Sequence, residues 1–127
     1  MLLPPDAATA TRIEVYRIGP APAGSGAGEP TVIGEWHDAG EVLALLAAVP
    51  PAGIARCFSP RFGLSAFAGG SARPVFRVAL CWSCRRALFS GPGVTPWQGM
   101  DPGSAPAAAL LARLKACEAE FEAAAPS

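Results

Sequence analysis

The chain has no run of about eighteen apolar residues, the length that a membrane-spanning helix needs. Its start, MLLPPDAATA, has no basic residue before the apolar pair and no apolar stretch long enough for a signal peptide. It also has no net charge, because 10 basic residues balance 10 acidic ones, so no overall field attracts nucleic acid or an anionic membrane. These absences predict a cytoplasmic protein with neither a membrane nor a nucleic-acid partner.

Catalytic signatures are equally scarce. His37 is the only histidine, and its position between Trp36 and Asp38 favours a surface or capping role over that of a catalytic base. The glycine-rich GSGAG follows PAPA and does not lead from a strand into a helix, as a phosphate-binding loop does. No complete catalytic constellation can be assembled. The sequence therefore favours a non-enzymatic accessory or protein-interaction domain over an enzyme.

The length of 127 residues predicts one domain over 1–127. Fourteen glycines and 14 prolines break the chain often, so short elements and long connections are expected. Residues 1–10 are predicted to be a flexible N-terminus, and 19–30 a Gly/Pro-rich loop.

Alternating apolar residues predict strands over 11–19 and 31–36. A capping-box pattern and apolar residues at helical spacing predict a helix over about 38–48, and a second helix is expected to follow Ser104. Between them, two long strands joined at AGGSARP form a hairpin. The element order predicts an α+β fold, in which a small antiparallel sheet of about four strands, including the long hairpin, carries two helices on one face.

Side chains of a strand alternate between the two faces of a sheet, and this alternation assigns the hairpin residues to an apolar and a polar face. Pairing apolar with apolar residues places Phe62 opposite residue 78 or 80 and requires a loop with an odd number of residues. In this alignment Cys57 and Cys81 share the polar face diagonally, whereas Cys84 faces the core and stays inert. The same alternation gathers three arginines near the Cys57–Cys81 pair: Arg61, Arg77 and Arg85.

The four cysteines leave several interpretations open. In a reducing cytosol free thiols are favoured over disulfides, and Cys117 lies in the apolar stripe of the last helix as a core residue. A reactive thiol face would use the Cys57–Cys81 pair with the arginines and could also take an anionic ligand.

No cofactor is expected unless a metal is bound, and that metal would be zinc. One Cys-x-x-Cys pair is present where two would be a strong zinc signal, and a strand splays its thiols apart. The ligands would be Cys57, Cys81, Cys84 and His37. Redox catalysis of the thioredoxin kind is disfavoured because the segment after CWSC is too short for the helix it requires.

A partner surface is the remaining prediction. VTPWQGM is expected to be a loop that carries Trp97 and Met100, and exposed tryptophan often dominates binding energy at protein interfaces. These two residues are the interface candidates, for a protein partner whose identity the sequence does not give.

Overall fold

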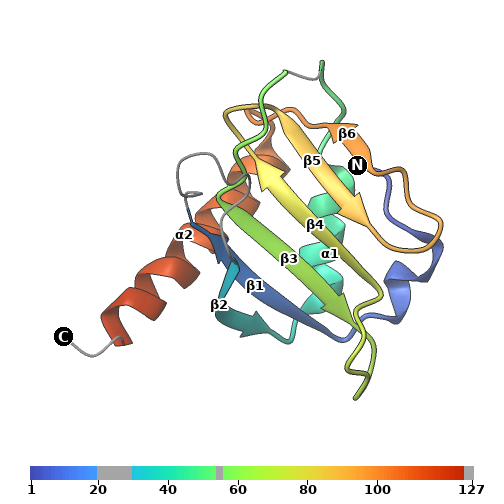
Figure 1. Ribbon diagram of the computed structural model, residues 1–127, viewed down its shortest axis with the longest axis vertical. Coiled ribbons are helices and arrows are strands. Elements are labelled where there is room, and N and C mark those ends of the chain that lie inside the picture. Colours follow the sequence, from blue (N-terminus) through green and yellow to red (C-terminus); the bar gives the residue numbers. More distant parts are fainter. Residues whose placement is uncertain (20–29, 54–55, 125–127) are drawn as a thin grey trace.

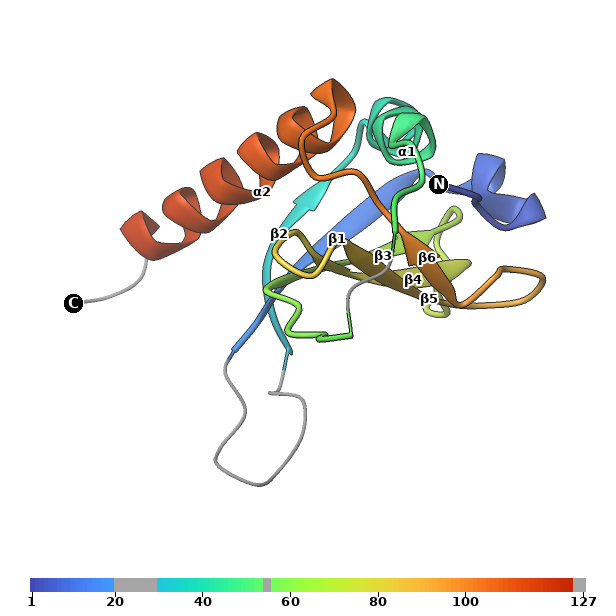
Figure 2. The same ribbon diagram turned by 90° about the horizontal axis from the view of Figure 1, so that it is seen from above.

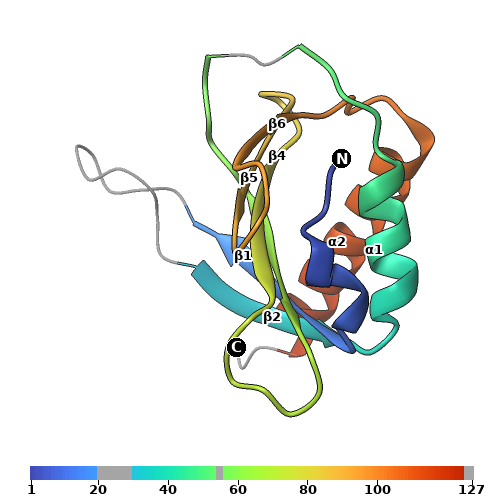
Figure 3. The ribbon, with the colours of Figure 1, turned by 90° about the vertical axis from the view of Figure 1, so that its right-hand side faces the viewer.

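The computed structural model describes residues 1–19, 30–53 and 56–124. Both α-helices cover one face of a single sheet, and the other face is turned to the viewer in Figure 1; Figures 2 and 3 show the two layers edge-on. The elements are η1 (Pro5–Thr9), β1 (Arg12–Ile18), β2 (Pro30–Trp36), α1 (Ala39–Ala48), β3 (Phe62–Phe67), β4 (Phe76–Cys81), β5 (Arg86–Ser90), β6 (Trp97–Gly99) and α2 (Ala105–Ala124).

The sheet has the strand order β2-β1-β3-β4-β5-β6, and every neighbouring pair is antiparallel. The predicted α+β class, with helices on one face of an antiparallel sheet, is confirmed. The strand count differs, because the sheet is 6-stranded where about four strands were expected. Helix α1 spans nearly the predicted residues, and α2 begins directly after Ser104 as predicted.

The extra strands arise where the long predicted hairpin is broken. Its second arm stops at Cys81 and turns, so β4 and β5 are separate antiparallel strands. Residues 97–99, predicted to lie in a loop, form the edge strand β6. The first arm begins only at Phe62, since the preceding Pro60 has no backbone amide to give to a sheet.

The predicted register of the remaining hairpin is confirmed. Phe62 pairs with Leu80, and Ala66 pairs with Phe76 across a loop with an odd number of residues. The core lies between the sheet and the helices. Its largest fully buried members are Phe62, Phe76, Phe89, Ile13, Leu46, Leu80, Met100, Leu110 and Leu114.

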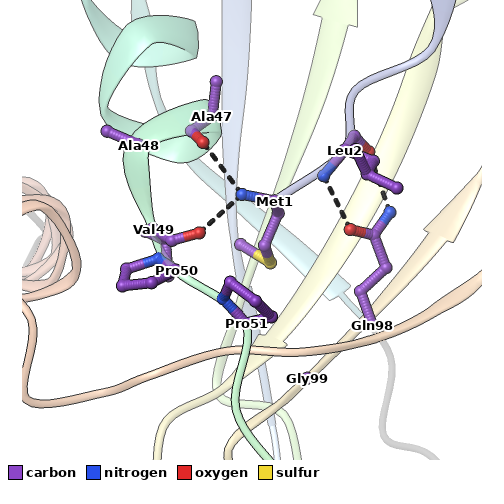
Figure 4. A pocket seen from close by; sticks show the side chains of 9 residues that line it. All are labelled: Met1, Leu2, Ala47, Ala48, Val49, Pro50, Pro51, Gln98 and Gly99. Atoms are coloured by element: carbon purple, nitrogen blue, oxygen red, sulfur yellow. Dashed lines mark hydrogen bonds between the residues drawn. The ribbon is translucent and has the colours of Figure 1, made fainter.

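The first ten residues, for which flexibility was expected, make specific contacts with the end of α1 (Figure 4). The amine of Met1 donates to the carbonyls of Ala47 at 2.9 Å and Val49 at 2.6 Å. Leu2 exchanges two hydrogen bonds with the Gln98 side chain, at 2.7 and 2.8 Å. A cation here satisfies carbonyls that a helix C-terminus leaves unpaired and complements the helix dipole.

Charged groups fix α2 to the sheet and to α1. Glu118 is buried at 8% exposure and forms ion pairs with Arg61 and, at 3.7 Å, with Arg17. Arg113 makes two hydrogen bonds to the Asp38 carboxylate, at 2.7 and 2.9 Å. Across the described residues, no helix has both the length and the apolarity needed to cross a membrane.

Candidate thiol site

The turn between β4 and β5 brings both cysteines of CWSC together. Cys81 pairs with Arg86 at the base of the turn, and the Arg85 amide donates to the Trp82 carbonyl at 3.2 Å. Arg85 has a φ of 52°, a left-handed conformation that glycine usually supplies. The turn therefore forms although CWSCRR contains no glycine.

Three hydrogen bonds organise the sulfur atoms in this turn. The Cys84 amide donates to Cys81 Sγ at 3.3 Å, and Ser83 Oγ lies 3.4 Å from the same sulfur. Ser83 Oγ also donates to Cys84 Sγ at 4.0 Å. One hydroxyl thus contacts both sulfurs, and the two cysteines do not splay to opposite faces of a strand.

A disulfide joins Cys57 to Cys84, with a Cα–Cα distance of 5.7 Å that is usual for such bonds. Cys84 is buried, whereas Cys57 is exposed. The prediction that Cys57 pairs with Cys81 is wrong, because Cys57 is bonded to Cys84, although Cys84 is buried as predicted. Alternation stops at Cys81, where the strand ends, and Cys57 lies outside any strand. The preference for free thiols is likewise wrong for Cys57 and Cys84.

The other two cysteines are free and buried. Cys117 packs in the core as predicted, donates to the Ile33 carbonyl at 3.7 Å, and has its pKa raised by burial. Cys81 lines a small pocket of about 200 Å³ beside the turn. Ser59, Arg61, Ser83 and Lys115 share that pocket. Two cationic side chains therefore lie in the surroundings of the Cys81 thiol.

The predicted arginine patch does not assemble. Arg61 is held by Glu118 on the helix side of the sheet. Arg77 lies on β4 four residues before Cys81, about 13 Å along the strand at the usual rise per residue. Arg85 is exposed in the turn itself. The three arginines do not form one patch, because Arg61 precedes β3, Arg77 lies in β4 and Arg85 lies in the β4–β5 turn.

His37 lies far from the cysteines in the sheet topology. His37 directly follows β2, whose last residues pair with the first residues of β1. The first residues of β1 in turn pair with the last residues of β3. Cys81 lies at the opposite end of the ladder, where the start of β3 meets the end of β4. His37 is exposed instead, 3.5 Å from Glu35. Within the described parts of the chain, no group of three or more metal-ligating side chains could hold a metal ion.

The interface candidates separate in the structure. Met100 is completely buried in the core, so it offers no surface to a partner. Trp97 is 41% exposed. The Phe58 ring lies edge-on to the Trp97 ring, with the two centroids 5.0 Å apart. The guanidinium carbon of Arg86 lies 4.0 Å from the centroid of the Trp97 ring. The sequence does not reveal these two contacts, because Phe58 lies in the non-strand segment before β3 and Arg86 reaches Trp97 through the pairing of β5 with β6.

Comparison of the chain with family models, with curated proteins and with solved structures found no match. A disulfide between an exposed and a buried sulfur, with a third thiol in the same turn, can undergo thiol–disulfide exchange.

Proposed function

We propose that the protein is a thiol-based redox protein whose reactive pair is Cys57 and Cys84. The observation that carries the proposal is the disulfide between exposed Cys57 and buried Cys84. Exposed disulfides are generally more easily reduced than enclosed structural ones.

Reduction needs an external thiol, of the low-molecular-weight or protein class. Its thiolate attacks Cys57 Sγ, which breaks the Cys57–Cys84 bond and forms a mixed disulfide on Cys57. Cys84 leaves as a thiolate, accepts a hydrogen bond from Ser83 and takes up a proton. A second external thiol then attacks the mixed disulfide, which releases an external disulfide and the Cys57 thiol. Two electrons and two protons are gained, and a disulfide oxidant reverses the sequence.

Cys81 provides a third sulfur for an exchange that needs no external reagent. Its thiolate, formed by proton loss, would attack Cys84 Sγ, form a Cys81–Cys84 bond and release Cys57, which takes up the proton. The shared contacts of Ser83 and the Cys84 amide hold the two sulfurs in the same turn. Disulfide mapping distinguishes this isomer from the Cys57–Cys84 form.

The test is thiol trapping followed by peptide mapping. Protein purified without reductant is denatured in N-ethylmaleimide, which should label two free cysteines, Cys81 and Cys117, and leave a Cys57–Cys84 cross-linked peptide. Treatment with a thiol reductant under native conditions should raise the label to all 4 cysteines, and removal of reductant should restore the cross-link. Cys57→Ser should abolish this cycle, whereas the control Cys117→Ser should retain it. Four free cysteines before reduction, or a cross-link that native reduction never opens, would refute the proposal.

Binding of a zinc ion by the reduced cysteines is the alternative to redox exchange. Elemental analysis of protein purified in reductant should find well under one zinc per chain, because a zinc site needs about four converging ligands and no group of even three converges among the described residues. Zinc near one per chain, lost in Cys84→Ser, would favour the metal site.

A non-enzymatic interaction domain is a second candidate, and exposed Trp97 is the observation that favours it. Aromatic and arginine side chains carry much of the energy of protein interfaces, and Trp97 lies against Arg86. Affinity purification from the native organism should recover a stoichiometric partner that Trp97→Ala loses. Val32→Ala is the matched control, since Val32 is 49% exposed on β2, at the opposite edge of the sheet from β6. Equal recovery with both variants would exclude Trp97 as the contact.

A further inference from the structure

A hollow of about 270 Å³ lies on the sheet face turned away from the helices, over β1, β3 and β4, the face seen in Figure 1. Its floor follows from the register. Tyr16 pairs with Gly63, which pairs with Ala79, so two small residues lie side by side next to a large aromatic one. Ile18 supplies the apolar wall beyond them. The sheet surface is therefore recessed where bulk is missing at Gly63 and Ala79.

The next row of the sheet supplies polar groups at the edge of the same hollow. Ser65 pairs with Arg77, and both residues line the hollow. Ser65 is completely buried, and among the described residues its hydroxyl interacts with the Tyr16 phenol but makes no hydrogen bond of regular geometry. Buried hydroxyls normally make well-formed hydrogen bonds, so the Ser65 hydroxyl can take a better partner from the hollow.

Arg77 adds a cation to the hollow. It is exposed, and among the residues that the structure describes no carboxylate forms an ion pair with it. The nearest acidic residue on this face, Glu14, is already engaged: it accepts a hydrogen bond from the Tyr16 hydroxyl at 3.0 Å and pairs with Arg12 at 3.6 Å. Burial raises the pKa of Tyr16, so its phenol stays neutral at the rim.

We propose that this hollow binds a small monocarboxylate with an apolar body. The carboxylate would pair with the Arg77 guanidinium and accept a hydrogen bond from the Ser65 hydroxyl, which would turn to it from the Tyr16 phenol. The apolar body would lie on Gly63 and Ala79 beside the Tyr16 ring. The volume of about 270 Å³ is just below the usual range for ligand pockets, about 300–1,000 Å³, so a compound with a single ring fits best. Glu14 would repel a second negative charge, which disfavours dicarboxylates.

The proposal is independent of the thiol chemistry, and it is tested with benzoate as the probe. Amide chemical shifts are followed by heteronuclear NMR during titration to millimolar concentrations, with benzamide as the neutral isostere and isophthalate as the dicarboxylate. Benzoate should give saturable shifts centred on Gly63, Ser65 and Ala79. Benzamide should bind at least about tenfold more weakly than benzoate, because it lacks the charged group that hydrogen-bonds to Arg77. Isophthalate should also bind at least about tenfold more weakly, because its second carboxylate adds a negative charge near Glu14.

Two arginine variants complete the test. Arg77→Gln should weaken benzoate at least about tenfold, whereas Arg73→Gln, an exposed arginine in the β3–β4 loop, should leave binding unchanged. Ala79→Leu should prevent benzoate binding by filling the floor of the hollow. Unchanged amide shifts outside the hollow would confirm that this variant is folded. The proposal is overturned if benzoate gives no saturable shifts, if benzamide binds equally well, or if the two arginine variants behave alike.

Discussion

The Sγ atom of Cys117 occupies the space that a side chain at Gly34 would need. A Cβ atom built at position 34 would lie 2.5 Å from that sulfur, closer than real Cβ contacts allow. Cys117 lies on α2 and also donates to the carbonyl of the neighbouring Ile33. The helix can therefore approach the edge strand β2 this closely only because residue 34 has no side chain.

Gly34→Ala should accordingly destabilise the protein by about 1–3 kcal/mol, the usual cost of overpacking a tight contact. Denaturant unfolding measures this change. The double variant Gly34→Ala with Cys117→Ala should recover part of the loss, because the new methyl group fills the space of the removed sulfur. The control Gly40→Ala lies in α1 with nothing within 4 Å of the added methyl and should be neutral or stabilising by up to about 1 kcal/mol. Equal losses in the two glycine variants would contradict the packing.

The Asp38–Arg113 pair predicts a dependence of stability on acid. Hydrogen bonds from Arg113 lower the pKa of Asp38 below its ordinary value. A depressed folded-state pKa stabilises the protein above the unfolded pKa of about 3.9, and this contribution is lost as the pH falls through the folded value. Because the Asp38 side chain is 39% exposed, the gain at pH 7 is limited to about 0.2–1 kcal/mol.

Asp38→Asn should therefore be less stable than the unsubstituted protein at pH 7 and equal to it near pH 2, as measured by urea unfolding across that range. Asp6→Asn removes the same charge from an exposed position with no ion pair in the described structure, and should not change the acid dependence. A gap between Asp38→Asn and the unsubstituted protein that persists at low pH would show that the pair is not its cause.

Glu118 and Glu122 both contact Arg17 but differ in burial. Glu118 is buried and also pairs with Arg61, so Glu118→Gln leaves two cations without their shared carboxylate and should cost about 1–3 kcal/mol. Glu122 has a side chain that is 62% exposed, and Glu122→Gln should cost under about 1 kcal/mol. Thermal unfolding compares the stability of the two variants directly. Equal losses of stability would show that the buried ion pairs of Glu118 contribute no more than the exposed pair of Glu122.

Accessibility predicts the order of alkylation in the reduced protein. Cys57 should react first with a maleimide at neutral pH, because it is exposed while Cys81, Cys84 and Cys117 are buried. The sequence alone predicts only that Cys57 or Cys81 reacts before the other two. Time-resolved mass mapping under native reducing conditions gives the order, and labelling of Cys81 as fast as Cys57 would show that the turn opens when the disulfide is broken.

The class of the fold follows from local patterns in the sequence. Alternation fixed the register of Phe62 opposite Leu80, and helical spacing with capping residues located α1 and α2. The number of strands did not follow, because Arg85 takes a left-handed conformation that its residue type does not announce. Without that signal the segment from 75 to 90 reads as one strand.

The thiol site was predicted in part, by its residues but not by its pairing. The cysteines of the turn and Cys57 were identified as candidates from their types and spacing. Their pairing depends on where β4 ends and on a non-strand segment that carries Cys57 to the turn. Ser83 and the recess at Gly63 and Ala79 also require the three-dimensional register, since small residues in strands carry no signal of a hollow.

The most direct test of the redox account is an equilibrium titration of the Cys57–Cys84 disulfide against reduced and oxidised glutathione, with the cross-linked fraction read by acid quenching and mass spectrometry. Because Cys57 is exposed, the account predicts a reversible two-electron transition with a midpoint above about −300 mV. Cys117→Ser should give the same midpoint. A cross-link that stays closed below about −300 mV would identify a structural disulfide, and that result, or a chain with no Cys57–Cys84 cross-link at any glutathione ratio, would contradict the account.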